Sequence, residues 1–278
     1  MPPKSEVATP PSVFRRIAKV AGDDVLVGGQ ALAVWVARYG VEIPDAMPFI
    51  TRDVDFLTSS PTDKASVKRY AEALHGKAEF PSAKAMTSLV GQAYKIVSDD
   101  EYLNVDVLWK LVGLKSEEVR KNATLTTMDD VSFLVMHPLD VLRSRLVNFH
   151  KIPAKKNEAG SMQLRLAIEV AREHLRATAA RSPASGLASG RSALQPMVSA
   201  IEKLALDDAG RKAARNFGIH VADAIDPSLI PAGPFWDKKW PTLKPLMSDA
   251  YGSRFDPPPA APAPGRKRST AHKTAARK

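Results

Sequence analysis

The sequence feature that most constrains the fold is the segment 51–57, in which polar and apolar residues alternate. Strict alternation predicts a β-strand with one buried face. Successive side chains of a strand point to opposite faces, so Asp53 and Asp55 project from the same face, about 7 Å apart along the chain. Val54 and Phe56 point the other way, into the core. A fold built on this strand therefore carries two carboxylates on one face of a sheet.

A second constraint lies upstream, where the apolar run 25–27 ends in Gly28 and Gly29. Residues 30–39 follow with apolar side chains at helical spacing, so we expect a strand, a tight glycine turn and a helix. Such a turn lets the backbone approach a phosphate, and the N–H groups of the helix start point at it. Gln30 adds an amide donor for a nucleotide at the same place. The alternative is a tight connection with no ligand.

A third acid, Asp106, lies in the alternating segment 102–109, which we expect to form a hairpin with 92–97. If this strand and 51–57 are neighbours, three carboxylates converge on one patch. Such a patch repels itself unless a cation neutralises it, and hard divalent ions take oxygen ligands. Two such ions, bridged by shared carboxylates, serve in-line phosphoryl or nucleotidyl displacement. The alternative is a set of exposed acids on strand surfaces.

Taken together, these residues resemble the nucleotidyltransferase superfamily of DNA polymerase beta. Members of that superfamily combine a glycine-rich first helix with an acid-X-acid strand and a third acid on a later strand. Within the superfamily the sequence is most similar to AbiEii-like bacterial proteins, which include toxin components of toxin–antitoxin pairs. The resemblance covers residues 20–110 and continues loosely through 137–150.

The resemblance implies a nucleotidyltransferase fold, Mg²⁺, an NTP donor and, for some members, tRNA or another RNA as acceptor. An antitoxin protein is a further partner that it implies. Carried over by position, Gly28 and Gly29 cradle the triphosphate. Asp53 and Asp55 hold the metal, and Asp106 completes the site and helps to activate the attacking hydroxyl.

The sequence departs from the family in two places. Superfamily members often have Ser after the first glycine, where this chain has Gly29 and then Gln30. The Lys-Asp…Asp-Leu run common in AbiEii-like proteins is replaced by residues 155–164.

Several further residues allow two interpretations. Arg143, Arg145 and Lys151 fall near one helical face, where they either bind a nucleotide or RNA phosphate or form a solvated surface. We expect His137, beside Pro138, to cap or pack rather than to catalyse. We expect the four tryptophans to be core or interface residues rather than base-stacking platforms: Trp35, Trp109, Trp236 and Trp240.

The order of elements predicts an α+β fold, a nucleotidyltransferase-like mixed sheet with flanking helices followed by a C-terminal helical domain. We expect a flexible leader at 1–10, the catalytic domain at 11–136 and the helical domain at 137–255. Residues 256–278 are rich in Pro and Ala, with six basic residues and one acid, and we expect a disordered basic tail. Such a tail either grips nucleic acid or acts as a solubilising arm.

Composition narrows the class of protein. The 278 residues include 40 Lys and Arg against 30 Asp and Glu, a net charge of +10 that suits an anionic partner. The chain has no Cys, which excludes disulfides, thiolate metal sites and cysteine nucleophiles. No apolar run approaches the roughly 18–20 residues that span a bilayer, and the first residues lack the apolar block of a secretory signal. We therefore expect a cytoplasmic protein with no membrane partner.

Two functions from different classes follow. The first is a Mg²⁺-dependent nucleotidyltransferase that moves a nucleoside monophosphate from an NTP to a hydroxyl, with RNA or tRNA as a candidate acceptor. A role in a toxin–antitoxin pair is part of this hypothesis. The second is a catalytically inactive protein that keeps the nucleotidyltransferase fold and binds nucleic acid or a partner protein.

Overall fold

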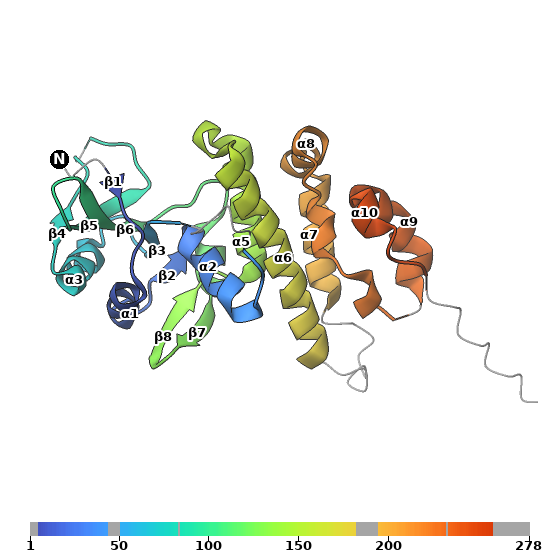
Figure 1. Ribbon diagram of the computed structural model, residues 1–278, viewed down its shortest axis with the longest axis horizontal. Coiled ribbons are helices and arrows are strands. Elements are labelled where there is room, and N and C mark those ends of the chain that lie inside the picture. The colour runs from blue at the N-terminus through green and yellow to red at the C-terminus, as the bar shows by residue number, and fades with distance from the viewer. Residues whose placement is uncertain (1–4, 44–50, 83, 182–193, 232, 258–278) are drawn as a thin grey trace, which may run out of the picture.

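The computed structural model describes residues 5–43, 51–82, 84–181, 194–231 and 233–257 (Figure 1). The strands are β1 (Ser5–Glu6), β2 (Val25–Val27), β3 (Val54–Leu57), β4 (Lys77–Glu79), β5 (Leu89–Ile96), β6 (Glu101–Leu108), β7 (Thr124–Met128) and β8 (Val131–Val135). The α-helices are α1 (Pro11–Lys19), α2 (Gly28–Tyr39), α3 (Lys64–Leu74), α4 (Ser116–Asn122), α5 (Pro138–Lys151), α6 (Glu158–Arg181), α7 (Leu194–Leu206), α8 (Asp208–Phe217), α9 (Trp240–Leu243) and α10 (Asp249–Gly252).

All eight of these strands belong to one mixed sheet. Its order is β4-β5-β6-β3-β2-β8-β7, and β1 also pairs with β6. The pairs β3–β6, β2–β8 and β1–β6 are parallel, and the other pairs are antiparallel. The expected α+β class with a mixed sheet, flanking helices and a C-terminal helical region is therefore confirmed.

Helices α1 and α3 cover the apolar face of the sheet, as the alternation in 51–57 predicts. Phe56 of β3 stacks on Tyr70 of α3, with ring centroids 4.7 Å apart. Phe14 of α1 meets Phe133 of β8 edge to face, with ring centroids 5.6 Å apart. Val54 and Phe56 are fully buried on this side. Asp53 and Asp55 alternate with them along the chain and therefore face the opposite side of the sheet.

The C-terminal half of the chain is helical (Figure 1). The 24-residue helix α6 runs across the molecule, with the sheet and α2 on one side and α7 to α10 on the other. Buried apolar residues extend from Phe14 to Tyr251, so the sheet and the helices share one continuous core. The expected basic tail, residues 256–278, lies outside the described part of the chain except for Asp256 and Pro257.

Four local features set the ends and the packing of the helices, and two of them, the cap at His137 and the burial of Trp35, confirm predictions from the sequence. Gly40 ends α2 with a φ of 63°, a left-handed conformation that favours glycine. Asp63 caps α3 by accepting a hydrogen bond from the Ser66 N–H at 3.2 Å. His137 caps α5, because its Nδ1 accepts from the Leu139 N–H at 3.2 Å. Trp35 is buried, and its Nε1–H donates to the main-chain oxygen of Met136 at 2.8 Å.

The amino-terminal segment differs from the expected flexible leader. Ser5 and Glu6 form β1, in parallel register with Glu101 and Tyr102 at the start of β6. Two main-chain hydrogen bonds join this segment to the start of β6: the Ser5 N–H donates to the Asp100 oxygen, and the Val7 N–H donates to the Tyr102 oxygen. A two-residue strand has no periodicity of its own, so only the pairing with β6 reveals it.

Within the described residues, no helix combines the length and the apolar character needed to cross a bilayer.

Candidate active site

The three predicted acids lie on one face of neighbouring strands. β3 pairs with β6 in parallel register, and Asp55 lies directly opposite Asp106. Asp53 precedes β3 by one residue and shares the face of Asp55. Parallel neighbours are about 4.8 Å apart, so the two strands bring together acids that are 51 positions apart in the chain.

The proximity of the three acids affects the pKa values of Asp55 and Asp106. Burial raises the pKa of Asp55 well above its ordinary value, and the charges of Asp53 and Asp106 raise it further. Burial also raises the pKa of Asp106, whereas hydrogen bonds from Gln92 and Asn104 lower it. Gln92 Nε2 donates to Asp106 Oδ1 at 2.8 Å and Asn104 Nδ2 donates to the same oxygen at 2.9 Å. Burial and mutual repulsion therefore disfavour the charged forms of Asp55 and Asp106.

The paired glycines bring the first turn of α2 directly against these acids. Gly28 has a φ of +68°, and a Cβ at this position would overlap Asp55 Oδ2. A Cβ at Gly29 would lie 2.5 Å from the Thr51 side chain, which itself donates a hydrogen bond to Asp53. Only glycine permits both the backbone conformation and the close approach at Gly28. The N–H groups at the N-terminus of α2 therefore lie beside the carboxylates of Asp53 and Asp55.

A cavity of about 200 Å³ opens between this face of the sheet and the helical half. Gly28, Gly29, Asp53 and Asp55 line one side of it. The other side comes from α5, from the segment that follows it and from α6, through Ser144, Arg145, Asn148, Lys155 and Gln163. Lys110 and Ser88 complete the polar lining. Carboxylates and cationic side chains thus face one space.

Arg145 is the most unusual of these cations. Its side chain is only 8% exposed, and it forms no ion pair within the described residues. Nη1 donates to Gln163 Oε1 at 3.1 Å, and Nε has no hydrogen-bond partner in the described part of the chain. Burial lowers the pKa of Arg145, and the charges of Asp55 and Asp53 raise it. A buried guanidinium with an unused N–H is a ready donor to an anionic ligand.

The structure separates the three basic residues that the sequence grouped on one helical face. Arg145 lines the cavity, whereas Arg143 and Lys151 do not. The sequence did contain a signal for this: Arg145 lies three residues after Leu142 and four before Phe149, on the apolar side of α5. A lone arginine on a buried helix face indicates a functional or paired group. Lys155 lies beyond the end of α5, so no helical pattern in the sequence indicated that it lines the cavity.

Glu6 is a fourth acid on the same face, and no local pattern in the sequence indicated it. It pairs with Tyr102, so its side chain lies on the same side of the sheet as Asn104 and Asp106. Burial and the charges of Asp53 and Asp106 raise the pKa of Glu6 to about 7, and a hydrogen bond from Asn104 and the charge of Arg52 lower it. Glu6 Oε1 is buried without a hydrogen-bond partner among the described residues.

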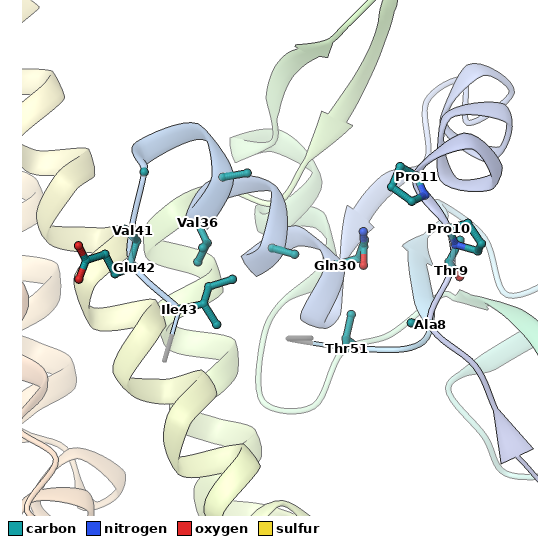
Figure 2. Close-up of a pocket in the computed structure, with 13 residues that line it drawn as sticks. Ala8, Thr9, Pro10, Pro11, Gln30, Val36, Val41, Glu42, Ile43 and Thr51 are labelled. Atoms are coloured by element: carbon teal, nitrogen blue, oxygen red, sulfur yellow. The ribbon is translucent and has the colours of Figure 1, made fainter. Parts of the chain in front are cut away.

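Gln30 lies outside the acidic cavity. It lines a larger neighbouring hollow of about 680 Å³ on the other side of the first turn of α2, together with Thr51 (Figure 2). The rest of this hollow is mostly apolar, between the segment around Pro10 and Pro11 and the segment that follows α2 (Figure 2). Thr51 lines both spaces. Asp106 also does not line the acidic cavity, although it shares the sheet face of Asp55.

The oxygen atoms on this face are of the kind that binds a hard divalent cation. The carboxylates lie near one another, and Glu6 Oε1 beside them has no hydrogen-bond partner among the described residues. In the described part of the chain, however, no three acidic, histidine or cysteine side chains are grouped so as to hold a metal ion by themselves. Mg²⁺ commonly takes one or two carboxylates and completes its shell with waters and substrate phosphates. Asp53 and Asp55 are the residues that would hold such an ion at the cavity, with Asp106 beside them.

Comparison with protein-family models finds no match to this chain, and comparison with curated proteins finds none either.

Proposed function

We propose that this protein is a nucleotidyltransferase, which transfers a nucleoside monophosphate from an NTP to a hydroxyl acceptor. One observation carries the proposal: two carboxylates, a glycine helix start and a buried arginine with no ion-pair partner among the described residues line a single cavity. Acids alone would suit a cation, and a buried arginine alone would suit an anion. A metal–triphosphate has both charges, and a cavity with one acidic and one cationic side complements it.

In the proposed reaction the acceptor oxygen forms a bond to the α-phosphorus of the NTP. The bond from that phosphorus to the oxygen bridging to the β-phosphate breaks, and pyrophosphate leaves with the electron pair. The hydroxyl proton passes to a carboxylate, for which Asp106 is the candidate because it lies on the acidic face beside Asp55. Bound Mg²⁺ would supply Lewis-acid stabilisation of the charge that develops on the transferred phosphorus.

The remaining groups position the donor. The N–H groups at the start of α2 face the triphosphate, which the Gly28 and Gly29 backbone can approach closely. Arg145 donates its Nε–H, which has no partner in the described part of the chain, to a phosphate oxygen, and Lys155 adds a second positive charge from the same side. These cations also offset the charge of Asp55, whose pKa both of them lower.

Label transfer tests the proposal. The full chain is incubated with Mg²⁺, each α-labelled NTP and total cellular RNA, and the RNA is then separated from the protein. We expect label in RNA or in the protein with the native chain and with Asp100→Asn, an exposed turn residue chosen as a matched control. We expect loss of label with Asp53→Asn and with Asp55→Asn. Unchanged labelling by either variant would refute the assignment.

Calorimetry separates this function from an inactive binding protein. Under the proposal, NTP binding requires Mg²⁺ and disappears in the Asp53→Ala, Asp55→Ala double variant. A chain that binds RNA but gives no heat with any NTP would establish the second hypothesis instead. The RNA acceptor and an antitoxin partner stay predictions from the family resemblance.

A further inference from the structure

The two outer edges of the sheet differ in their exposure to pairing. Strand β4 forms one edge and has three residues, of which Lys77 and Glu79 are exposed and charged. Short edge strands with charged side chains discourage pairing with another chain. Strand β7 forms the other edge, and its five residues include no charge and no proline. β7 therefore keeps an edge on which a further strand can form.

The register of β7 shows which of its main-chain groups point outward. Met128 and Val131 form the pair that closes the two-residue turn of the β7–β8 hairpin. This closing pair exchanges hydrogen bonds, and bonded and non-bonded pairs then alternate along an antiparallel ladder. Leu125 and Thr127 belong to the non-bonded pairs, so their N–H and C=O groups point away from β8. Within the described residues, no other strand pairs with this outer edge.

The outer edge of β7 borders a groove of about 410 Å³, which Thr126, Thr127 and Met128 all line. Side chains of consecutive strand residues point to opposite faces, so three residues in a row border one space along the edge of the strand. The lining from the helices is mostly apolar: Pro11 and Phe14 of α1 with Ala33, Val34, Ala37 and Arg38 of α2. An unpaired strand edge and a helix thus face each other across the groove.

Two polar side chains of the groove lack a partner in the described part of the chain. Thr126 is 4% exposed, and its Oγ1 is buried without a hydrogen-bond partner there. Arg38 is exposed and forms no ion pair with the described residues; its guanidinium lies 5.9 Å from the centre of the Trp35 ring. A cation beside an apolar groove favours an occupant that carries a carboxylate.

We propose that the edge of β7 binds an extended segment of another protein, which adds a strand to the sheet in the groove between β7 and α2. The outward main-chain groups of Leu125 and Thr127 hydrogen-bond to the segment, and its apolar side chains contact Phe14 and Ala37. An acidic side chain of the segment pairs with Arg38. Because α2 forms the opposite wall, the groove suits a single strand rather than the sheet of a second folded copy. This inference concerns a protein partner and does not rest on the proposed nucleotidyl transfer.

Selection from a library of random nine-residue peptides displayed on phage tests the proposal with the full native chain. We expect selected peptides to alternate apolar and polar residues and to contain Asp or Glu. The synthesised peptides should slow amide hydrogen exchange of Leu125 and Thr127 at least about 10-fold. Methylation of the peptide nitrogens that face β7 should abolish binding, whereas methylation of the alternate nitrogens should not, because every second amide of an added strand points away from β7.

Three substitutions locate the bound peptide. Thr127→Pro removes an outward N–H without removing a bond to β8, so we expect peptide binding at least about 10-fold weaker. Arg38→Met should weaken binding about 3–5-fold, as expected for an ion pair that stays partly in water. Lys68→Met changes an exposed cation of α3 outside the groove, is the matched control and leaves binding unchanged. Circular dichroism checks folding, and if Thr127→Pro does not fold, the exchange pattern of the native chain and the methylated peptides decide.

Enrichment of no peptide overturns the proposal, as do selected peptides that bind Thr127→Pro as tightly as the native chain. Protection of other amides with unchanged exchange at Leu125 and Thr127 overturns it as well. Sedimentation of the native chain alone covers the remaining occupant. A dimer that Thr127→Pro dissociates would assign the edge to a second copy of this chain and refute a separate partner.

Discussion

Gly28→Ala tests whether the close approach of α2 to the acidic face is as tight as the structure shows. Gly28 has a φ of +68°, and an added Cβ would overlap Asp55 Oδ2. The left-handed conformation alone costs an alanine about 1–2 kcal/mol. Forcing a buried neighbour to shift adds about 1–3 kcal/mol. We therefore expect Gly28→Ala to lower the free energy of unfolding by about 2–5 kcal/mol.

Gly40→Ala is the matched control. Gly40 has a nearly identical φ of +63°, but nothing lies within 4 Å of a Cβ built there. This substitution carries the backbone cost without the contact, so we expect a loss of about 1–2 kcal/mol. Urea denaturation followed by circular dichroism measures both variants, and the difference between them isolates the contact with Asp55.

A double-mutant cycle identifies the contact partner. Asp55→Ala removes the two overlapping atoms and leaves only Asp55 Cβ, 3.1 Å from the added carbon. We expect the pair Gly28→Ala and Asp55→Ala to be coupled by at least about 1 kcal/mol in the relieving direction. Equal losses for Gly28→Ala and Gly40→Ala, or additive effects in the cycle, would show that the glycine turn does not press on the acid.

Three further predictions concern charge. Burial lowers the pKa of His174 to about 4 from 6.5, so the unfolded chain binds the extra proton between these values, and stability falls as the pH drops from about 6.5 to 4. We expect a loss of about 2 kcal/mol over this window, reduced for partial exposure, in denaturation curves of the native chain, and a smaller loss for His174→Gln, in which the buried His137 still titrates with a lowered pKa. Arg145→Met should weaken Mg²⁺–NTP binding at least about 10-fold in calorimetry, the usual effect of losing a charged hydrogen bond, whereas Arg143→Met should not. Without divalent cations, Asp55→Asn should raise the melting temperature at pH 7, because burial and its neighbours disfavour the charged form; a lower melting temperature would contradict this.

Much of the acidic face was accessible from the sequence. The alternation in 51–57 correctly predicted that Phe56 is buried and that Asp53 and Asp55 share the other face. The two glycines after an apolar run correctly predicted a strand followed by a helix, but α2 begins at Gly28 itself, so the glycines are its first residues and not a separate turn before residue 30. These features follow from periods of two and 3.6 residues and from the conformational freedom of glycine, which are properties of neighbouring residues.

Other features depended on contacts between distant segments. The sequence allowed β3 and β6 to be neighbours, but only the sheet shows their parallel register and places Asp55 opposite Asp106. Glu6 belongs to a two-residue strand with no local pattern, and the pairing with β6 brings it to the acids. Arg145 reaches the cavity because α5 packs its apolar side toward the sheet; the sequence placed it between Leu142 and Phe149 but did not show what that side of the helix meets.

The sequence by itself determined which side chains share a face, because that depends on the backbone geometry of a few consecutive residues. The tertiary structure alone decided which faces meet, because strand pairing and helix packing join segments whose separation along the chain leaves no local trace. The shared face of Asp53 and Asp55 was therefore predictable, whereas the meeting of that face with Arg145 and Lys155, and the fourth acid beside it, were not.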